Sequence, residues 1–315
     1  MIRAIFSRIL AAIPVLVGIA IITFFLIRLI PGDIVNVIMG QDYGDPVFEA
    51  ELRRLFGLDR PVHVQFSDWF TSLLQGDLGH SLRTRRPVVT EILDRFPMTL
   101  ELTLAALIVS VSIALPLGII SATRRNSTAD MAARLASLMG LSLPNFWLGI
   151  LLIMLFSVAW GILPSGGYAD FAFSWNHFQY LVLPAVTLGT SLAAVTMRMT
   201  RSSLLEVLGI DYVRTARSKG LPERIVIGRH ALKNALIPVV TVIGIQAGGL
   251  LGGALVVEQV FSWPGLGTLV IRSIEQRDYP LVQGLIIFLA FFFVLMSLVV
   301  DLLYLYLDPR LRRRG

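Results

Sequence analysis

The sequence predicts an all-α polytopic membrane protein with six transmembrane helices. Hydrophobic residues make up 55% of the 315 residues and charged residues only 15%, and the mean hydropathy is +0.75, whereas soluble domains carry about 25% charged residues. A spanning helix needs roughly 20 apolar residues, because each residue rises about 1.5 Å through a hydrocarbon core about 30 Å thick. Six charge-free runs have this length: 9–27, 102–123, 135–169, 171–197, 234–257 and 279–300.

The lengths of these runs set the expected organisation of the chain. The first run is longer than the apolar region of a signal peptide and lacks a small-residue cleavage site, so it predicts a retained helix. The third run is one span followed by a glycine- and proline-rich turn. We therefore expect a first helix within 1–30, an extracytoplasmic segment at 31–98, a membrane domain at 99–308 with five helices at about 99–121, 135–160, 180–197, 236–257 and 281–306, a cytoplasmic loop at 198–235 within that domain, and a basic tail at 309–315.

The basic residues predict the orientation of the spans. With a cytoplasmic N-terminus, the inside segments hold 17 basic residues, and the two short outside loops hold only Arg272 and Arg277. Cytoplasmic loops carry an excess of Lys and Arg, so both termini are expected in the cytoplasm. The net charge of +6 is thereby explained by orientation and contact with the lipid bilayer, and we expect no nucleic-acid partner.

The extracytoplasmic segment 31–98 is too polar to span but carries apolar residues at helical spacing. These residues are Val62, Phe66, Trp69, Phe70 and Leu73. The spacing predicts short amphipathic helices on the outer surface. They either lie in the headgroup layer or form a lid or docking surface around a pore, and the sequence leaves both interpretations open.

A short helix with clear start and stop signals lies in the loop before the fifth span. Asp211 suits the N-cap, Arg217 suits the last turn, and Gly220 suits the left-handed residue after the helix. Pro222 prevents continuation of the helix. A helix of about eight residues is marginal in water and needs a surface to rest on. That surface is either the cytoplasmic end of its own bundle or a groove on a partner protein.

The fifth span carries Gly244, Gly248 and Gly252 at intervals of four residues. Small residues at this spacing form a flat stripe that lets another backbone or a substrate approach closely. The stripe therefore predicts either helix packing or a lining of a translocation path.

The residues needed for several chemistries are missing from the sequence. It has no cysteine and no GxxxxGK[ST], HExxH or GxSxG motif, so we expect no ATP site, no metal centre and no catalytic residue in this chain. The four histidines fall outside the predicted spans. Arg28 and Glu101 are expected at span edges, where snorkelling suffices, and Asp301 in the sixth span is expected to pair with an arginine of the tail.

Several longer motifs occur in a fixed order along the chain. They are 28–33 (RLIPGD), 56–59 (FGLD), 76–79 (GDLG), 97–101 (PMTLE), 143–146 (LPNF), 211–220 (DYVRTARSKG) with 229–235 (RHALKNA), 258–267 (EQVFSWPGLG), 277–280 (RDYP) and 308–310 (DPR). In these motifs the chain resembles the permease subunits of ATP-binding-cassette importers, in the dipeptide, oligopeptide and nickel branch. The resemblance covers nearly the whole chain.

The resemblance implies a type I importer permease architecture and a role for the short cytoplasmic helix. In that family this loop carries a coupling helix that inserts into a cleft of the ATPase subunit. The residues expected to serve this coupling are Asp211, Arg214, Thr215, Ala216, Arg217 and Gly220. Arg214, Thr215 and Ala216 stand where a generic Glu-Ala-Ala would be, so the family's glutamate is absent here.

The resemblance also implies partners, location and cargo. The expected partners are a second related permease, two ATPases that bind ATP and Mg, and an extracytoplasmic solute-binding protein, all at the bacterial inner membrane. The chain would be a transport subunit and not an enzyme, moving di- or oligopeptides by alternating access. Nickel or another small solute such as glutathione is the alternative cargo. From other classes, an ATP-independent carrier would transport alone, and an intramembrane enzyme would need a polar dyad at membrane depth.

Overall fold

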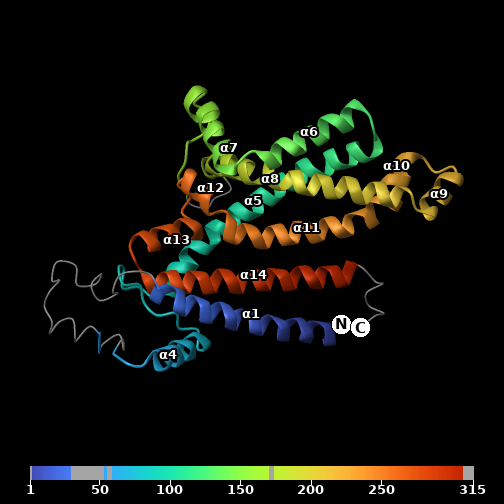
Figure 1. Cartoon of the computed structure of the whole chain (residues 1–315). Coiled ribbons are helices and arrows are strands. Elements are labelled where there is room, and N and C mark those ends of the chain that lie inside the picture. The colour runs from blue at the N-terminus through green and yellow to red at the C-terminus, as the bar shows by residue number, and fades with distance from the viewer. Residues whose placement is uncertain (1, 30–52, 55–58, 170–173, 308–315) are drawn as a thin grey trace.

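The chain folds into a bundle of long helices, seen in a computed structural model that describes residues 2–29, 53–54, 59–169 and 174–307 (Figure 1). The named α-helices in chain order are α1 (Ile2–Leu29), α4 (Val62–Leu74), α5 (Val88–Thr123), α6 (Thr128–Ser142), α7 (Asn145–Leu152), α8 (Trp175–Leu208), α9 (Asp211–Ser218), α10 (Glu223–Ile225), α11 (Leu232–Gly253), α12 (Leu255–Val260), α13 (Leu266–Glu275) and α14 (Tyr279–Leu307), with π-helical turns η2 (Ile153–Ala159) and η3 (Val226–Ala231).

The predicted spans all fall on helices of this bundle. Within the described ranges, four helical stretches are long and apolar enough to cross a membrane by length and composition: α5, α8, Glu223–Leu250 and α14. The bent pair of α6 with α7 and η2 gives a fifth, and α1 contains the shorter apolar stretch Leu10–Leu26. The all-α polytopic fold class is confirmed.

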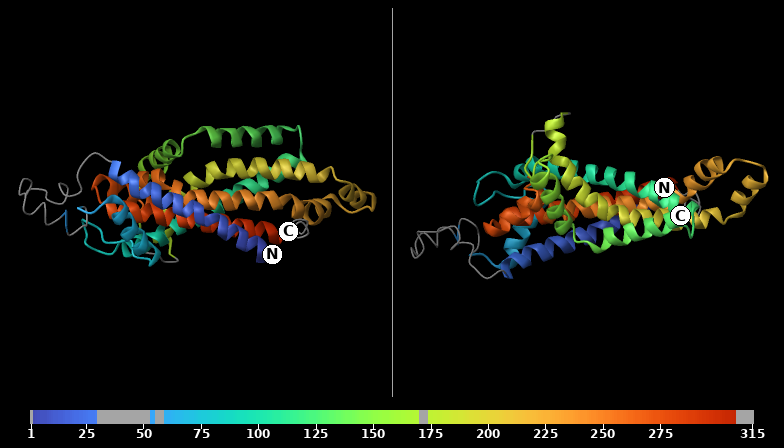
Figure 2. Two further views of the ribbon diagram at one scale, coloured as in Figure 1. Left: turned by 60° about the horizontal axis from the view of Figure 1, so that its bottom comes forward. Right: turned by 90° about the horizontal axis from the view of Figure 1, so that it is seen from above.

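The third span differs from its prediction as one helix over 135–160. The helices on either side of Leu143 and Pro144 meet at 102°, and Leu143 itself is extended, with φ −83° and ψ 125°. A proline disfavours the helical conformation of the residue before it, and its ring blocks the preceding turn, so the helix has to end at Ser142. The segment after the break packs on α8 and α12, where a Cβ added at Gly149 would lie 3.1 Å from the ring of Phe261. It projects across the long axis of the bundle in the right-hand view of Figure 2.

Two other helices are longer than the apolar runs that predicted them. α5 begins at Val88 and not near 99, so residues 88–98 of the expected extracytoplasmic segment belong to this helix. α8 spans Trp175–Leu208 and thereby covers the first part of the expected loop 198–235. The helices continue beyond the hydrocarbon thickness because polar residues also form helices in the aqueous layers. Charge-free runs therefore underestimate helix length.

The most extensive helix–helix contact in the described part of the bundle joins α5 to α8. A Cβ added at Gly118 of α5 would lie 2.7 Å from Cβ of Thr200, and one at Gly189 of α8 would lie 2.7 Å from Cβ of Val109 and 2.8 Å from the carbonyl oxygen of Ala106. Glycine thus lets the two backbones approach closely at both ends of their crossing. These two glycines fix α5 and α8 as one rigid pair.

The two ends of the bundle carry the segments that the sequence places on opposite sides of the membrane. The start of α1, the end of α14 and the α9 segment lie at one end, and α4 and α13 lie at the other (Figures 1 and 2). At the second end α4 packs on α1, where the ring of Phe24 lies 5.1 Å from that of Phe66 and 5.4 Å from that of Trp69. The amphipathic helix predicted around Phe66 is therefore present and rests on the first span.

Candidate functional site

The cytoplasmic helix α9 is anchored to its own bundle by two small apolar side chains. Val213 and Ala216 are buried and pack in a cluster with Ala122 of α5, Leu204 of α8 and Val226 of η3. The remaining positions of α9, namely Asp211, Tyr212, Arg214, Thr215, Arg217 and Ser218, are exposed. The helix thus has an inner face that rests on the bundle and an outer face that is polar and basic.

Two polar contacts fix α9 to the helices that follow it. The hydroxyl of Tyr212 donates to the carbonyl of His230 at 3.2 Å and accepts from the side-chain amide of Asn234 at 2.8 Å. Arg217 forms a double contact with Glu223, with Nε to Oε2 at 3.1 Å and Nη2 to Oε1 at 2.6 Å. The hydrogen bond to Glu223 raises the pKa of Arg217 above its usual value. Because these contacts bridge both sides of the turn, α9 and the base of α11 should move as one body.

The turn after α9 has the conformation that the sequence predicts. Gly220 has φ +77°, and its amide donates to the carbonyl of Arg217 at 2.9 Å. Only glycine adopts this region at little cost. Asp211, by contrast, is the first residue of the helix and not its N-cap. Ile210 takes the cap position without a side-chain hydrogen bond, so the prediction for Asp211 was wrong; its carboxylate lies 3.5 Å from Arg214 Nη1.

The six residues expected to act in coupling divide between the two faces of α9 and the turn that follows. Arg214, Thr215 and Arg217 lie on the exposed side, as the helix register requires. Ala216 is 7% exposed and packs inward, so it positions the helix and is not available to a partner in this conformation. The contact surface that α9 offers is therefore formed mainly by Arg214 and its exposed neighbours.

The glycine stripe of α11 faces another helix of the same chain. A Cβ added at Gly244 would lie 2.2 Å from Cγ2 of Val300 on α14, and one at Gly248 would lie 3.5 Å from Met296 and Phe293. Gly252 lies in the last turn of α11, and its surroundings fall outside the described residues. For Gly244 and Gly248 the structure supports helix packing and not the lining of a path.

A buried carboxylate fixes the turn between α12 and α13. The sequence analysis did not predict this role. Glu258 is fully buried, accepts from the Thr99 hydroxyl at 2.8 Å and accepts from the Thr268 amide at 3.0 Å. Thr99 also accepts from the amide of Leu266 at 2.8 Å. Glu258 thereby ties this turn to α5. The sequence did contain a signal for it, because Glu258 directly follows the charge-free run 234–257.

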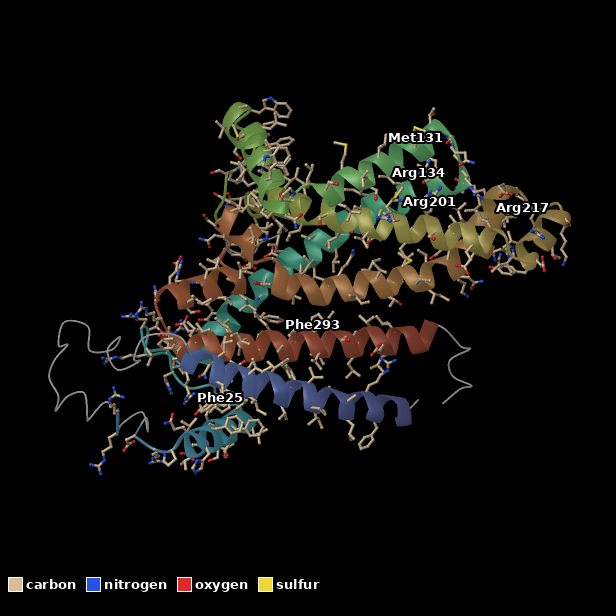
Figure 3. The ribbon with its side chains drawn as sticks, in the orientation of Figure 1. Phe25, Met131, Arg134, Arg201, Arg217 and Phe293 are labelled. Atoms are coloured by element: carbon tan, nitrogen blue, oxygen red, sulfur yellow. The ribbon has the colours of Figure 1, made fainter. Side chains whose placement is uncertain are left out.

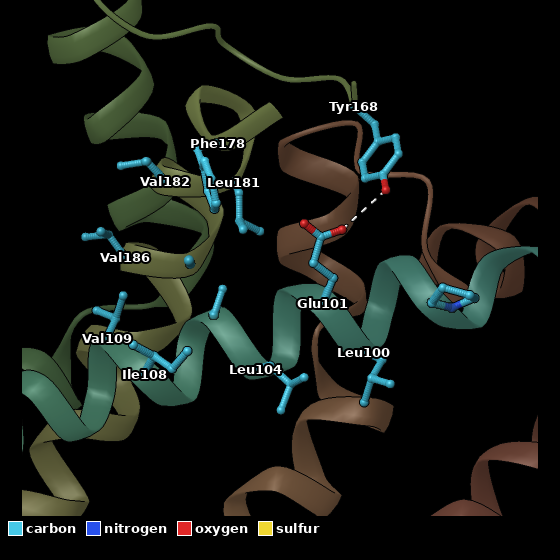
Figure 4. Close-up of a pocket in the computed structure, with 13 residues that line it drawn as sticks. Leu100, Glu101, Leu104, Ile108, Val109, Tyr168, Phe178, Leu181, Val182 and Val186 are labelled. Carbon is cyan, nitrogen blue, oxygen red and sulfur yellow. Dashed lines mark hydrogen bonds between the residues drawn. The ribbon is translucent and has the colours of Figure 1, made fainter. Parts of the chain in front are cut away.

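A polar cluster that the sequence did not predict lies at one end of an apolar groove between α5 and α8. The groove has a volume of about 770 Å³ and its lining includes Leu104, Ile108 and Val186. Glu101 sits at its end, where its carboxylate contacts Nε2 of His177 and accepts from the Tyr168 hydroxyl at 3.3 Å (Figure 4). Glu101 is therefore not a snorkelling residue, and the expectation that every histidine lies outside the spanning helices was wrong, because His177 is buried in α8.

Two further charged groups pair within the bundle. Asp301 of α14 contacts Arg8 of α1; the expected partner, an arginine of the tail, lies outside the described residues. Asp130 of α6 is fully buried and bonded to Arg201 of α8. Across the described ranges no group of three or more His, Cys, Asp or Glu side chains could hold a metal ion.

Comparison with family models identifies the chain as a polytopic transport subunit of the bacterial inner membrane. Residues 114–313 match the family described as "Binding-protein-dependent transport system inner membrane component", and residues 1–103 match its N-terminal counterpart, "Binding-prot-dependent transport system membrane comp, N-term". The chain belongs to this family of binding-protein-dependent transport system inner membrane components. The recognition made from the sequence motifs is confirmed.

Curated relatives match over nearly their full length. The chain is 46% identical to the di/tripeptide transport system permease protein DppB of Pseudomonas aeruginosa (strain UCBPP-PA14), covering 96% of each chain. It is 45% identical to the glutathione transport system permease protein GsiC of Salmonella choleraesuis (99% of each) and 42% identical to the dipeptide transport system permease protein DppB of Escherichia coli (strain K12; 100% of each). A solved structure of inward-facing conformations of the MetNI methionine ABC transporter has the same fold, with TM-score 0.58 and 18% identity over 70% of this chain and 97% of that one.

Proposed function

We propose that the chain is the membrane subunit of an ATP-driven importer that moves short peptides inward. It works with a second related permease, two ATPases that bind ATP and Mg, and an extracytoplasmic solute-binding protein. The chain itself hydrolyses no ATP and holds no cofactor. Family membership supports a binding-protein-dependent system, and two of the relatives described above, both named as di- or tripeptide permeases, support di- or tripeptides as cargo.

The observation that carries the coupling role is the construction of α9. Its inner face is fixed to α5, α8 and η3, and its outer face is polar, exposed and basic. A short helix held this firmly transmits a push at its outer face to the bundle as rigid-body motion. We infer that Arg214 and Arg217 lie at the ATPase surface, that Asp211 and Thr215 border this contact, and that Ala216 and Gly220 hold the helix in position.

The groove between α5 and α8 favours a peptide over a metal ion as cargo. Its walls are aliphatic along most of their length, and Glu101, which also contacts His177 and Tyr168, supplies a single carboxylate at one end. This combination suits an α-ammonium group followed by apolar side chains. Glutathione fits the same groove chemistry and stays the alternative cargo, also because one of the relatives reported above is a glutathione permease.

Reconstitution separates these possibilities. The chain, purified with its co-expressed partner subunits, is placed in proteoliposomes with ATP inside, and uptake of a labelled dipeptide is measured with the solute-binding protein outside. We expect uptake that stops without ATP and that excess unlabelled dipeptide suppresses more strongly than glutathione or Ni²⁺ does. Uptake by the chain alone, driven by an ion gradient, would instead make it a secondary carrier.

A further inference from the structure

A second groove lies between α6 and α8 on the cytoplasmic half of the bundle, away from both α9 and the apolar groove. Its volume is about 670 Å³, and three of its lining residues are arginines: Arg134 on α6, and Arg198 and Arg201 on α8. Figure 3 labels Arg134 and Arg201 side by side on their two helices. The coupling role uses none of these residues.

A buried carboxylate fixes two of the three guanidinium groups. Asp130 is fully buried, and its carboxylate accepts hydrogen bonds from Nε of Arg201 at 2.9 Å and Nη2 of Arg201 at 3.1 Å. Nε of Arg134 forms an ion pair with the same carboxylate at 3.3 Å. Ser121 adds a hydrogen bond to the same carboxylate at 2.5 Å. A guanidinium has five N–H donors, so Arg201 keeps Nη1 and Arg134 keeps both terminal nitrogens for another acceptor. The pairing holds these donors in place before any ligand arrives.

The third arginine adds charge without an internal partner. Arg198 is exposed, and no described residue forms a hydrogen bond or ion pair with it. The groove thus holds three guanidinium groups, two of which share the carboxylate of Asp130, and this leaves two positive charges in the groove. Such an arrangement attracts an anion with several acceptor oxygens, since guanidinium donors match phosphate and carboxylate geometry.

Three apolar lining residues, Leu138, Leu141 and Val195, lie deeper in the membrane than the basic residues of their own helices, and Met199 lies between the two arginines of α8. α6 starts at the cytoplasmic end, so Leu138 and Leu141 lie one and two turns further into the bilayer than Arg134. α8 ends at the cytoplasmic end, so Val195 lies one turn deeper than Arg198. From Arg134 to Leu141 the depth changes by about 10 Å. The groove therefore has a charged mouth at headgroup level and an apolar floor at acyl-chain level.

We propose that this groove binds an anionic phospholipid of the cytoplasmic leaflet, with its phosphate on the three arginines and an acyl chain along Leu138, Leu141 and Val195. Basic pockets between spanning helices on the cytoplasmic side bind lipid headgroups of this kind. A bound lipid would brace α6 against α8 and thereby help to hold α7, which follows α6 directly in the chain. The proposal does not depend on the identity of the cargo.

Lipid binding to the full chain tests the proposal directly. The importer is purified in a neutral detergent, titrated with phosphatidylglycerol or phosphatidylcholine, and bound lipid is counted by native mass spectrometry. Arg198→Gln removes a charge that has no internal contact, so the fold should be unaffected. We expect it to weaken phosphatidylglycerol binding about fivefold. Arg125→Gln, which removes an exposed charge from the turn between α5 and α6 outside this groove, should leave binding unchanged.

Three outcomes would overturn the proposal. Equal binding by the Arg198 and Arg125 variants would show that the arginine mouth holds no headgroup. Displacement of the lipid by inorganic phosphate alone would make the groove a free-anion site and remove the role of the apolar floor. Because the chain has no cysteine, Val195→Cys gives a single reactive thiol, and crosslinking of that thiol to the second permease in native membranes would mean that a protein covers the groove.

Discussion

Replacing Gly244 by alanine adds one methyl group where α11 meets α14, and Gly249→Ala adds the same group to the same helix at an open position. The new Cβ at position 244 would lie 2.2 Å from Cγ2 of Val300 and 3.2 Å from its Cβ, whereas nothing lies within 4 Å at position 249. Two carbon atoms attract each other at separations of about 3.5 Å or more. Therefore α11 and α14 must separate by about 1 Å, or Val300 must rotate. Valine has one strongly preferred rotamer in a helix, which makes rotation costly.

The magnitude follows from comparing the two alanine variants. Both gain the same helix propensity, up to about 1 kcal/mol, so that contribution cancels. Overpacking costs about 1–3 kcal/mol, and we expect Gly244→Ala to be less stable than Gly249→Ala by that amount. Unfolding in mixed micelles with increasing denaturing detergent measures the difference. Adding Val300→Ala to Gly244→Ala should recover most of it. Equal stability of the two single variants would refute the close contact between α11 and α14.

Two further predictions concern the buried carboxylate and the topology. Glu258→Gln replaces by an amide donor one of the two carboxylate oxygens that accept from Thr99 and Thr268. One of these hydrogen bonds is then lost, so unfolding should become easier by about 1–3 kcal/mol. The inverse change at the exposed neighbour, Gln259→Glu, should be neutral, and a similar loss in both would contradict the assigned hydrogen bonds. Reporter fusions after Asn126 should report cytoplasm and those at Asp77 the outside, because the two positions lie at opposite ends of the bundle. Exchanged signals would reverse the topology, and the same side for both would show that α5 does not cross the membrane.

Much of the fold could be predicted because membrane spans are long and apolar. The signals at the C-terminal end of α9 were also sufficient: Gly220 has the positive φ that its place after Arg217 and Lys219 suggested. The signal at the N-terminal end misled by one residue, because Ile210 and not Asp211 takes the cap position. The break at Pro144 was accessible in principle, since a proline restricts the residue before it. It was missed because an uninterrupted apolar run concealed the end of the helix at Ser142.

The side-chain pairs could not be predicted in the same way, since each joins residues far apart in sequence. Asp130 resembles an ordinary first-turn acid after the N-cap Ser127, and only the packing of α6 on α8 reveals Arg201 as its partner. His177 and Glu101 meet because α5 and α8 cross closely at their glycines. Arg8 pairs with Asp301 because the first and last helices lie side by side. Periodicity defines faces of helices, but it does not say which faces meet.

Coupling through α9 is the central claim, and Gly220→Val tests it most directly. Valine at φ +77° costs about 1–3 kcal/mol of backbone strain, which should misdirect the turn and tilt the helix. Gly228→Val, in the same loop but without a positive φ, is the matched control. ATP hydrolysis stimulated by loaded binding protein is measured on importers purified with each variant. The account predicts a strong loss for Gly220→Val with normal membrane insertion and near-normal hydrolysis for the control. Full stimulation and intact ATPase binding in Gly220→Val, and also in Arg214→Glu, would contradict it.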